Sequence, residues 1–153
     1  MLTFTGCQKE TEIKPQSVFS ADFTLSYNEM QIKGEIEAYE TQRVKIKVAS
    51  PESLAGMSAT AENDNFEINY NGMSVSYTKD DLPEGAFFKL VLMSLDKIID
   101  SDGLEFESTD GGYTATEETE LGDMTIFLSD KFFIESIKIP NQGFNLKLTE
   151  KGV

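Results

Sequence analysis

Histidine and tryptophan are absent from this 153-residue chain, and cysteine occurs once, at Cys7. Without histidine the chain cannot form a Ser-His-Asp or Cys-His catalytic pair. The lack of histidine and of a second cysteine also excludes the common zinc sites and an intrachain disulfide. Carboxylates alone could serve a glycosidase, but nothing in the sequence pairs two of the 27 acidic residues across a sugar. We therefore expect no catalytic residues, no cofactor and no metal, and a protein that is not an enzyme.

Basic residues are also scarce. The chain has 13 Lys and Arg against 27 Asp and Glu, so its net charge is −14. Binding to nucleic-acid phosphates requires clustered cations, and the sequence has no basic run. We therefore expect no nucleic-acid partner. Hydrophobic residues make up 39% of the chain and include 11 Phe and 5 Tyr, which excludes disorder and is typical of one compact domain.

Cys7 follows Phe4-Thr5-Gly6 and precedes a polar stretch over residues 8–12. This arrangement resembles a bacterial lipobox. The resemblance implies that the Cys7 thiol receives a diacylglyceryl group and that Cys7 becomes the new N-terminus. Because a signal peptide needs roughly 7–15 apolar residues before the cut, we expect the true start to lie upstream of Met1. The alternative is an incidental free thiol near a disordered terminus, where cysteine acts as a small hydrophobe.

Residues 1–16 are accordingly expected to comprise the end of a signal peptide, the lipobox and a flexible tether. A lipidated Cys7 would make the membrane a partner through the N-terminus. It would also place the protein outside the cytoplasm, lipid-anchored to the bacterial cell membrane or envelope.

Residues 17–153 are expected to form a single domain dominated by strands. Apolar residues occupy alternate positions there, and this period of two predicts about ten or eleven strands. The alternating segments are residues 19–27, 32–38, 44–48, 58–60, 66–70, 73–77, 104–106, 113–115, 124–128, 132–134, 137–139 and 144–148. Asn71-Gly72 predicts a tight hairpin, since both residues accept positive φ. Phe132-Phe133 interrupts the alternation and indicates a bulge or a strand buried on both faces.

Residues 84–101 are expected to form the main helix. Apolar residues cover more than half of its circumference, which predicts that the helix is enclosed. Lys89, Asp96 and Lys97 interrupt it too often for a bilayer span. The predicted fold is therefore α+β and mainly β: a highly curved antiparallel sheet, or incomplete β-barrel, that encloses one helix. Residues 117–120 are expected at an exposed hairpin end, with a cation or partner site as the alternative.

The order of these elements is similar to that of a known superfamily. Together with Gly34-Glu35-Ile36, residues 43–46, Pro51 and residues 64–70, it resembles the LolA/LppX-like superfamily, which contains the outer-membrane lipoprotein carriers and small lipoproteins of unknown role. The resemblance covers residues 17–149. It implies an incomplete antiparallel barrel, closed by helices, whose apolar interior accepts acyl chains.

Four helix residues are the predicted lining of such a cavity: Phe87, Phe88, Leu92 and Met93. Flexible Phe and Met side chains suit an apolar ligand of variable shape, although the same residues could simply fill the core. The first functional hypothesis is an extracytoplasmic, membrane-anchored lipoprotein that binds a lipid or acyl chain between the concave sheet and the helix. The alternative is an envelope interaction module that has a solid core, no ligand and a protein partner.

Overall fold

The computed structural model describes residues 13–39, 43–78, 81, 87–100 and 104–151. Its elements are, in chain order, β1 (Phe19–Tyr27), β2 (Met30–Tyr39), β3 (Arg43–Ser50), β4 (Ser58–Glu62), β5 (Asn65–Tyr70), β6 (Met73–Thr78), α1 (Phe87–Asp100), β7 (Glu107–Thr109), β8 (Gly112–Thr119), β9 (Gly122–Ser129), β10 (Ile134–Ile139), the 3-10 helix η3 (Pro140–Gln142) and β11 (Phe144–Glu150).

The strands form one antiparallel sheet of 11 strands in the order β6-β5-β4-β3-β2-β1-β11-β10-β9-β8-β7. Neighbours along the chain pair in every hairpin, and the two halves of the sheet join where β1 pairs with β11. The outermost strands, β6 and β7, are consecutive strands in the chain with α1 between them. The sheet is therefore open at β6 and β7, which confirms the predicted curved sheet or incomplete barrel.

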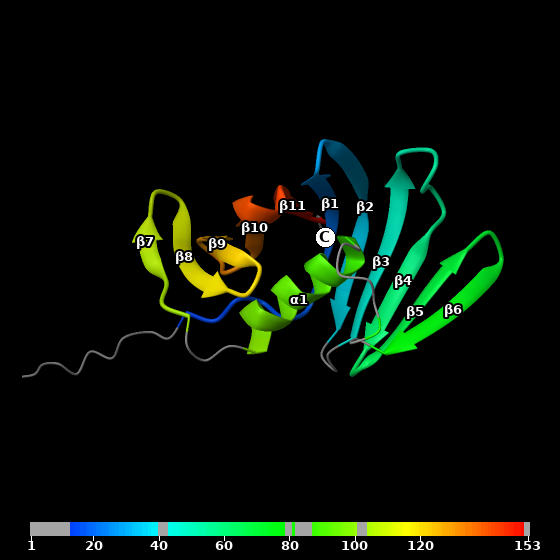
Figure 1. Ribbon diagram of the computed structural model, residues 1–153. Helices are drawn as coiled ribbons and strands as arrows, with labels where there is room; N and C mark the ends of the chain where they lie inside the picture. The colour runs from blue at the N-terminus through cyan, green and yellow to red at the C-terminus, as the bar shows by residue number, and fades with distance from the viewer. Residues whose placement is uncertain (1–12, 40–42, 79–80, 82–86, 101–103, 152–153) are drawn as a thin grey trace, which may run out of the picture.

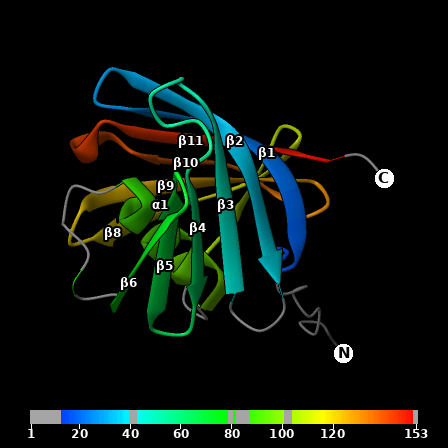
Figure 2. The ribbon, with the colours of Figure 1, turned by 90° about the vertical axis from the view of Figure 1, so that its right-hand side faces the viewer.

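The helix α1 connects the two outermost strands by crossing the concave face of the sheet. Figure 1 shows it between the β7–β9 strands on one side and the β3–β6 strands on the other, and Figure 2 shows the strands curving around it. No helix in the described ranges has the length and apolar character needed to cross a membrane. The helix lies within the residues predicted for it, 84–101, and the sheet encloses it as expected.

The core lies between α1 and the concave face. Alternation places Phe19, Ala21, Phe23 and Leu25 of β1 on this face, where each is at most 7% exposed. The buried apolar residues of α1 are Phe88, Leu90, Val91, Leu92, Leu95 and Ile98. The buried Ser94 hydroxyl donates a hydrogen bond to the Val91 carbonyl at 2.9 Å, so burial does not leave it unpaired. One helix thus fills the centre of the curve.

The hairpin predicted at Asn71-Gly72 is confirmed. The two residues have φ of 51° and 79° and connect β5 to β6. Two positive φ values in a two-residue connection are typical of a type I′ turn, whose twist matches that of the paired strands. Tyr70 and Met73 face each other directly across this turn.

Residues 104–106 do not form the strand predicted for them, because β7 begins only at Glu107. Leu104 and Phe106 pack half-buried against the core. The two residues alternate with exposed Glu105 because both side chains reach the core. The backbone of residues 104–106 does not pair with a neighbouring strand. An alternating sequence pattern indicates which side chains are buried. Near the edge of a sheet, a side chain can be buried although its backbone forms no hydrogen bonds to a neighbouring strand.

Residues 132–134 were also expected to be a strand, but β10 begins at Ile134 and continues through the segment predicted separately at 137–139. Phe132 lies in a turn with φ of 68°. The turn is closed by Ser129, whose hydroxyl accepts hydrogen bonds from the backbone N–H groups of Lys131 and Phe133 at 3.1 and 3.2 Å. The interruption of the alternation is therefore a tight turn, and the sheet irregularity lies between Ile134 and Ser136.

Candidate functional site

The candidate site is an apolar part of the concave face that α1 leaves uncovered. We call it the β5–β6 apolar surface, and its members are Ile68, Tyr70, Met73, Val75 and Tyr77. Cross-strand pairing joins Ile68 to Val75 and Tyr70 to Met73, while Tyr77 faces the buried core residue Phe66. Because directly opposite residues share a face of the sheet, all five side chains lie on the face of Phe66.

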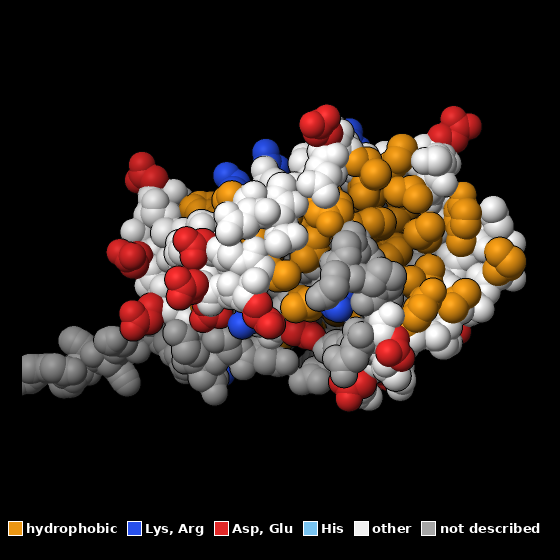
Figure 3. Space-filling view, in the orientation of Figure 1, with side chains coloured by type: hydrophobic (Ala, Val, Ile, Leu, Met, Phe, Trp, Pro, Cys, Tyr) orange, Lys and Arg blue, Asp and Glu red, His pale blue; other side chains and the backbone are white. Residues whose placement is uncertain are grey.

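The surface is open to solvent at its outer strand. Met73 is 68% exposed and Val75 is 48% exposed. Ile68 and Tyr77 are half-buried and pack against the core. Figure 3 shows apolar side chains gathered on this side of the molecule, over the β3–β6 strands. A group of neighbouring exposed apolar residues on a concave face differs from the single exposed hydrophobes of an ordinary surface.

Polar groups surround this surface. The Tyr70 hydroxyl donates a hydrogen bond to the Ser53 carbonyl in the β3–β4 connection at 2.8 Å. On the opposite face of the same strands, the Ser74 hydroxyl donates to the Glu67 carboxylate at 3.1 Å. The sheet therefore separates an apolar concave face from a polar convex face at this edge. The first can contact hydrocarbon and the second faces water.

The four helix residues predicted to line a cavity lie in different surroundings. Phe88 and Leu92 are each 3% exposed and belong to the buried core. Phe87 is half-buried and stacks on Phe88 with 4.2 Å between the ring centroids. Met93 lines a cavity of about 10 Å³ together with Leu121 and Met124. A cavity of that size holds at most one water molecule. Phe87, Phe88 and Leu92 do not line this cavity.

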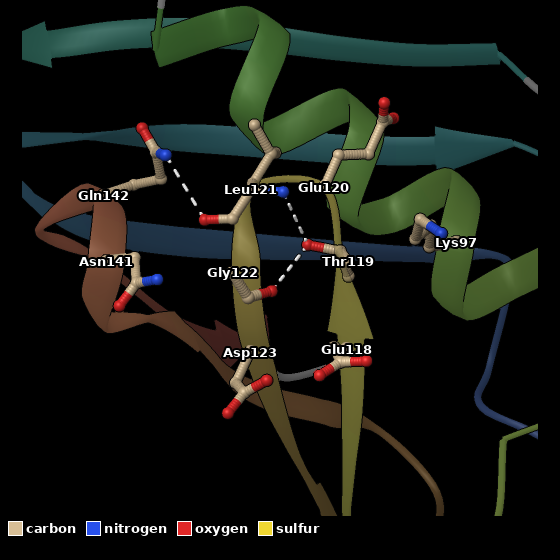
Figure 4. Close-up of a pocket in the computed structure, with 9 residues that line it drawn as sticks. All are labelled: Lys97, Glu118, Thr119, Glu120, Leu121, Gly122, Asp123, Asn141 and Gln142. Atoms are coloured by element: carbon tan, nitrogen blue, oxygen red, sulfur yellow. Dashed lines mark hydrogen bonds between the residues drawn. The ribbon is translucent and has the colours of Figure 1, made fainter.

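A second hollow lies at the tip of the β8–β9 hairpin, where Figure 4 shows the residues that line it. It is a wide, open depression of about 1000 Å³ that includes Lys97, Glu118 and Glu120. Hydrogen bonds hold its wall: the Thr119 hydroxyl donates to the Gly122 carbonyl at 2.6 Å, and Gln142 donates from Nε2 to the Leu121 carbonyl at 3.2 Å.

The hairpin end predicted over residues 117–120 is thus found as the end of β8 and the turn into β9. In the part of the chain that the structure describes, no three acidic or cysteine side chains are grouped closely enough to hold a metal ion. The hydrogen bonds of Thr119 and Gln142 join the hairpin turn to itself and to η3, which is a structural role.

In the part of the chain that the structure describes, two surface groups have shifted pKa values, and neither belongs to the β5–β6 apolar surface. A hydrogen bond from Lys151 to Glu35, with Nζ and Oε2 3.0 Å apart, raises the pKa of the lysine. Partial desolvation, and then a hydrogen bond with Glu37, raises the pKa of Tyr39. The Lys151 pair joins the end of β11 to β2 across β1, which is a structural role at the sheet surface.

Cys7 lies outside the described residues. Within the predicted tether, residues 13–16 lie against the domain. Ile13 packs on the core, and the Gln16 backbone N–H donates to the Phe132 carbonyl at 2.9 Å. The polypeptide therefore enters the domain beside the turn at Phe132.

The sequence shows that β6 has an apolar face, but it does not show that this face is exposed or that it could bind a ligand. Met73, Val75 and Tyr77 alternate with Ser74 and Ser76, and this pattern indicates only a strand with one apolar face. Whether α1 would cover that face depends on where the helix crosses the sheet. The helix residues predicted from the sequence lie elsewhere: Phe88 and Leu92 are buried residues of α1, each 3% exposed, and do not belong to this surface.

No model of a known protein family and no curated protein matches the sequence. Solved structures do match the fold. An uncharacterized conserved protein from Thermus thermophilus is 10% identical, with a TM-score of 0.55, over 87% of this chain and 77% of the other. A structure of the CwlD amidase from Clostridioides difficile in complex with the GerS lipoprotein matches at 14% identity and a TM-score of 0.48, over 81% and 76% of the two chains.

A LolA superfamily protein from Nitrosomonas europaea matches at 9% identity and a TM-score of 0.44, over 92% of this chain and 87% of the other. At these identities the similarities concern the fold alone.

Proposed function

We propose that this protein is an extracytoplasmic, membrane-anchored lipoprotein that binds a lipid or acyl chain on the β5–β6 apolar surface. The observation that carries the proposal is the exposure of Met73 and Val75 on the concave face, 68% and 48%, beside an enclosed helix. Apolar area of this kind gains free energy when hydrocarbon covers it, at about 25 cal/mol per Å². In this proposal the ligand lies beside α1, where apolar side chains are exposed, because Phe88 and Leu92 of the helix are each only 3% exposed.

The chemistry of the surface favours an apolar ligand over a polar one. Its five side chains carry no charge, and their polar atoms are the two tyrosine hydroxyls. One of these, on Tyr70, already donates to the Ser53 carbonyl. Concave sites with predominantly apolar and aromatic lining and few polar groups are typical of small hydrophobic ligands. Cross-strand packing holds the apolar side chains in register, so the surface is formed before the ligand arrives.

The location follows from Cys7 and from the net charge. A diacylglyceryl group on Cys7 provides two acyl chains, which suffice for stable membrane attachment where one does not. The net charge of −14 repels an anionic leaflet. The tether would therefore hold the domain near the membrane while its charge keeps the domain off the surface, where a diffusing acyl chain can reach the concave face.

Binding is tested with a fluorescent fatty acid, dansyl-labelled undecanoic acid, titrated into the 153-residue chain. We expect Val75→Asp to weaken binding by about 10-fold or more, because ligand contact would require desolvating the new carboxylate. Ser76→Asp is the matched control: it adds the same charge on the opposite face of the same strand and should change affinity by less than about 2-fold. Equal affinity of both variants and the wild type, or no binding by the wild type, would contradict the proposal.

The lipid anchor is tested separately in a bacterial host that expresses the protein from its own gene and is fed an alkyne-labelled palmitate. We expect the wild-type protein to carry the label and to partition into detergent, and Cys7→Ser to lose both properties, because the acyl chains need the thiol. Lys9→Ala, two residues later, should keep the label. An unlabelled wild-type protein would refute the anchor while leaving the ligand site untouched.

A further inference from the structure

The edge strand β6 lacks the features that usually protect the edge of a sheet. Within the described residues β6 pairs only with β5, so one side of its backbone is open. Met73–Thr78 contains no charged residue and no proline, although 26% of the chain is charged. Natural edge strands are normally blunted by charge, proline, bulges or shortness. The other edge, β7, follows that rule, because it has three residues and begins with Glu107.

The open side of β6 presents the backbone groups of Ser74 and Ser76. In the two-residue hairpin, Tyr70 and Met73 form the pair next to the turn. Backbone hydrogen bonding alternates along an antiparallel strand. The N–H and C=O groups of Met73, Val75 and Tyr77 therefore point to β5, and those of Ser74 and Ser76 point away from the sheet. Among the described residues no backbone group bonds to this side of Ser74 and Ser76, so the two residues are a template for another strand.

The sequence of this strand is nearly symmetric about Val75. It reads Met-Ser-Val-Ser-Tyr over residues 73–77, with the apolar side chains on the concave face and the serines on the convex face. We infer that β6 pairs antiparallel with β6 of a second copy of this chain, on a two-fold axis that passes through the Val75 pair. Such an interface is isologous and closes after two copies.

This register is complementary on both faces. Val75 faces Val75 of the second copy, and Met73 faces Tyr77 of the second copy, so apolar side chains meet on the concave face. On the convex face Ser74 faces Ser76 of the second copy. These serines are the residues with outward backbone groups, so each Ser74–Ser76 pair exchanges two backbone hydrogen bonds. The two β5–β6 apolar surfaces then adjoin across the axis.

The pairing with a second copy should depend on salt concentration. The strand itself contains no charged residue. Glu67 lies one strand inward, on β5, but its carboxylate reaches the Ser74 hydroxyl of β6 at 3.1 Å on the convex face. The Glu67 carboxylates of the two copies therefore lie close to the interface and repel each other, as do the net charges of −14 per copy. Added salt screens this repulsion, so it should strengthen the dimer.

The register is tested by disulfide trapping in a Cys7→Ser background. Directly opposite residues of a pair without mutual backbone hydrogen bonds have Cα atoms about 4.5 Å apart, which suits a disulfide. We expect Val75→Cys to oxidise to a covalent dimer. Met73→Cys is the matched control. Its sulfur faces Tyr77 of the second copy and lies more than about 13 Å from its own counterpart, so it should stay monomeric. Trapping at Met73 and not at Val75 would overturn the register.

Association is tested by sedimentation of the same full chain from about 1 μM to about 1 mM. We expect a monomer–dimer equilibrium that shifts toward dimer between about 0.05 M and about 0.5 M salt. Ser76→Pro removes an outward N–H and should weaken dimerisation by about 10-fold or more, while Ser76→Thr should keep it. Thermal melting at low concentration confirms that both variants are folded. A monomer at all concentrations, or open-ended oligomers, would overturn the inference.

The same variants separate this inference from fatty-acid binding. Ser76→Pro leaves the five side chains of the β5–β6 apolar surface unchanged, so it should bind the fatty acid as the wild type does. Loss of dimer with retained binding supports both proposals. Dimerisation without fatty-acid binding would refute only the ligand proposal.

Discussion

Replacing Leu92 with aspartate should unfold the domain. Leu92 lies on α1, is 3% exposed and belongs to the core. A carboxylate there would be buried without a partner, or would have to be protonated, and either costs several kcal/mol. We expect a loss of about 4 kcal/mol or more, against a total stability of about 5–15 kcal/mol for a domain. Urea unfolding followed by circular dichroism measures the change.

The matched control for this prediction is Lys97→Ala on the same helix. The side chain of Lys97 is 42% exposed, and its ion pair with Glu117 is long, with Nζ and Oε2 3.9 Å apart. Pairs of this kind contribute about 0–1 kcal/mol, so the midpoint should hardly move. A Leu92→Asp protein with wild-type stability would show that α1 is not packed against the sheet as the structure has it.

This result also decides how the ligand site can be studied. Charged substitutions of Phe88 and Leu92 are useful probes of binding only if these residues line an open cavity. Because both are 3% exposed, a loss of binding in such variants would report unfolding. Val75 is 48% exposed, so the fold can tolerate a charge at this position. The charge would still weaken the binding of an apolar ligand.

Gly34→Ala is the second substitution with a large expected effect. Gly34 lies in β2, between Phe23 of β1 and Val48 of β3. An added Cβ would overlap the backbone carbonyl oxygen of Lys47 and lie 2.9 Å from Cε2 of Phe23. Neither neighbour can move cheaply, since one is backbone in the centre of the sheet and the other is a buried ring. We expect a loss of about 3 kcal/mol or more in unfolding free energy.

Gly56→Ala separates this crowding from the conformational cost of replacing glycine. Gly56 has φ of +92°, but an added Cβ would meet nothing within 4 Å. The expected loss is about 1–2 kcal/mol, from the left-handed backbone alone. Thermal and urea unfolding of the two variants should rank Gly34→Ala as clearly the more damaging. Equal effects would mean that β2 and β3 can separate at Gly34 without disturbing the core.

The sequence predicted most of the sheet because strand formation here follows a local pattern. Alternating side chains from Phe19 onward must place one set on a core and the other in water, and only an extended chain does this with a period of two. The hairpin at Asn71-Gly72 was predictable for a similar reason, since the turn needs positive φ at both residues. Residues 104–106 were assigned wrongly because their side chains are half-buried while their backbone is not part of the ladder.

The candidate site was only partly predictable. The sequence indicated a helix whose apolar residues must be covered, and it placed Phe87, Phe88, Leu92 and Met93 on that helix. It could not show that Phe88 and Leu92 would be buried in the core or that Met93 and Leu121 would line the same small cavity. Those outcomes depend on the angle at which α1 crosses the sheet, and that angle is set by contacts among residues far apart in the chain.

By itself, then, the sequence determined the classes of chemistry that this chain lacks, the strands and the helix, and the polar and apolar faces of each strand. These follow from residue types and from short-range periodicity. Only the tertiary structure decided that β1 pairs with β11, that β6 and β7 stay apart as the two edges, and that one helix leaves the β5–β6 apolar surface uncovered. The physical reason is that strand pairing and coverage by the helix are long-range contacts. The same alternating strand is buried where a helix covers it and exposed where the helix does not reach it.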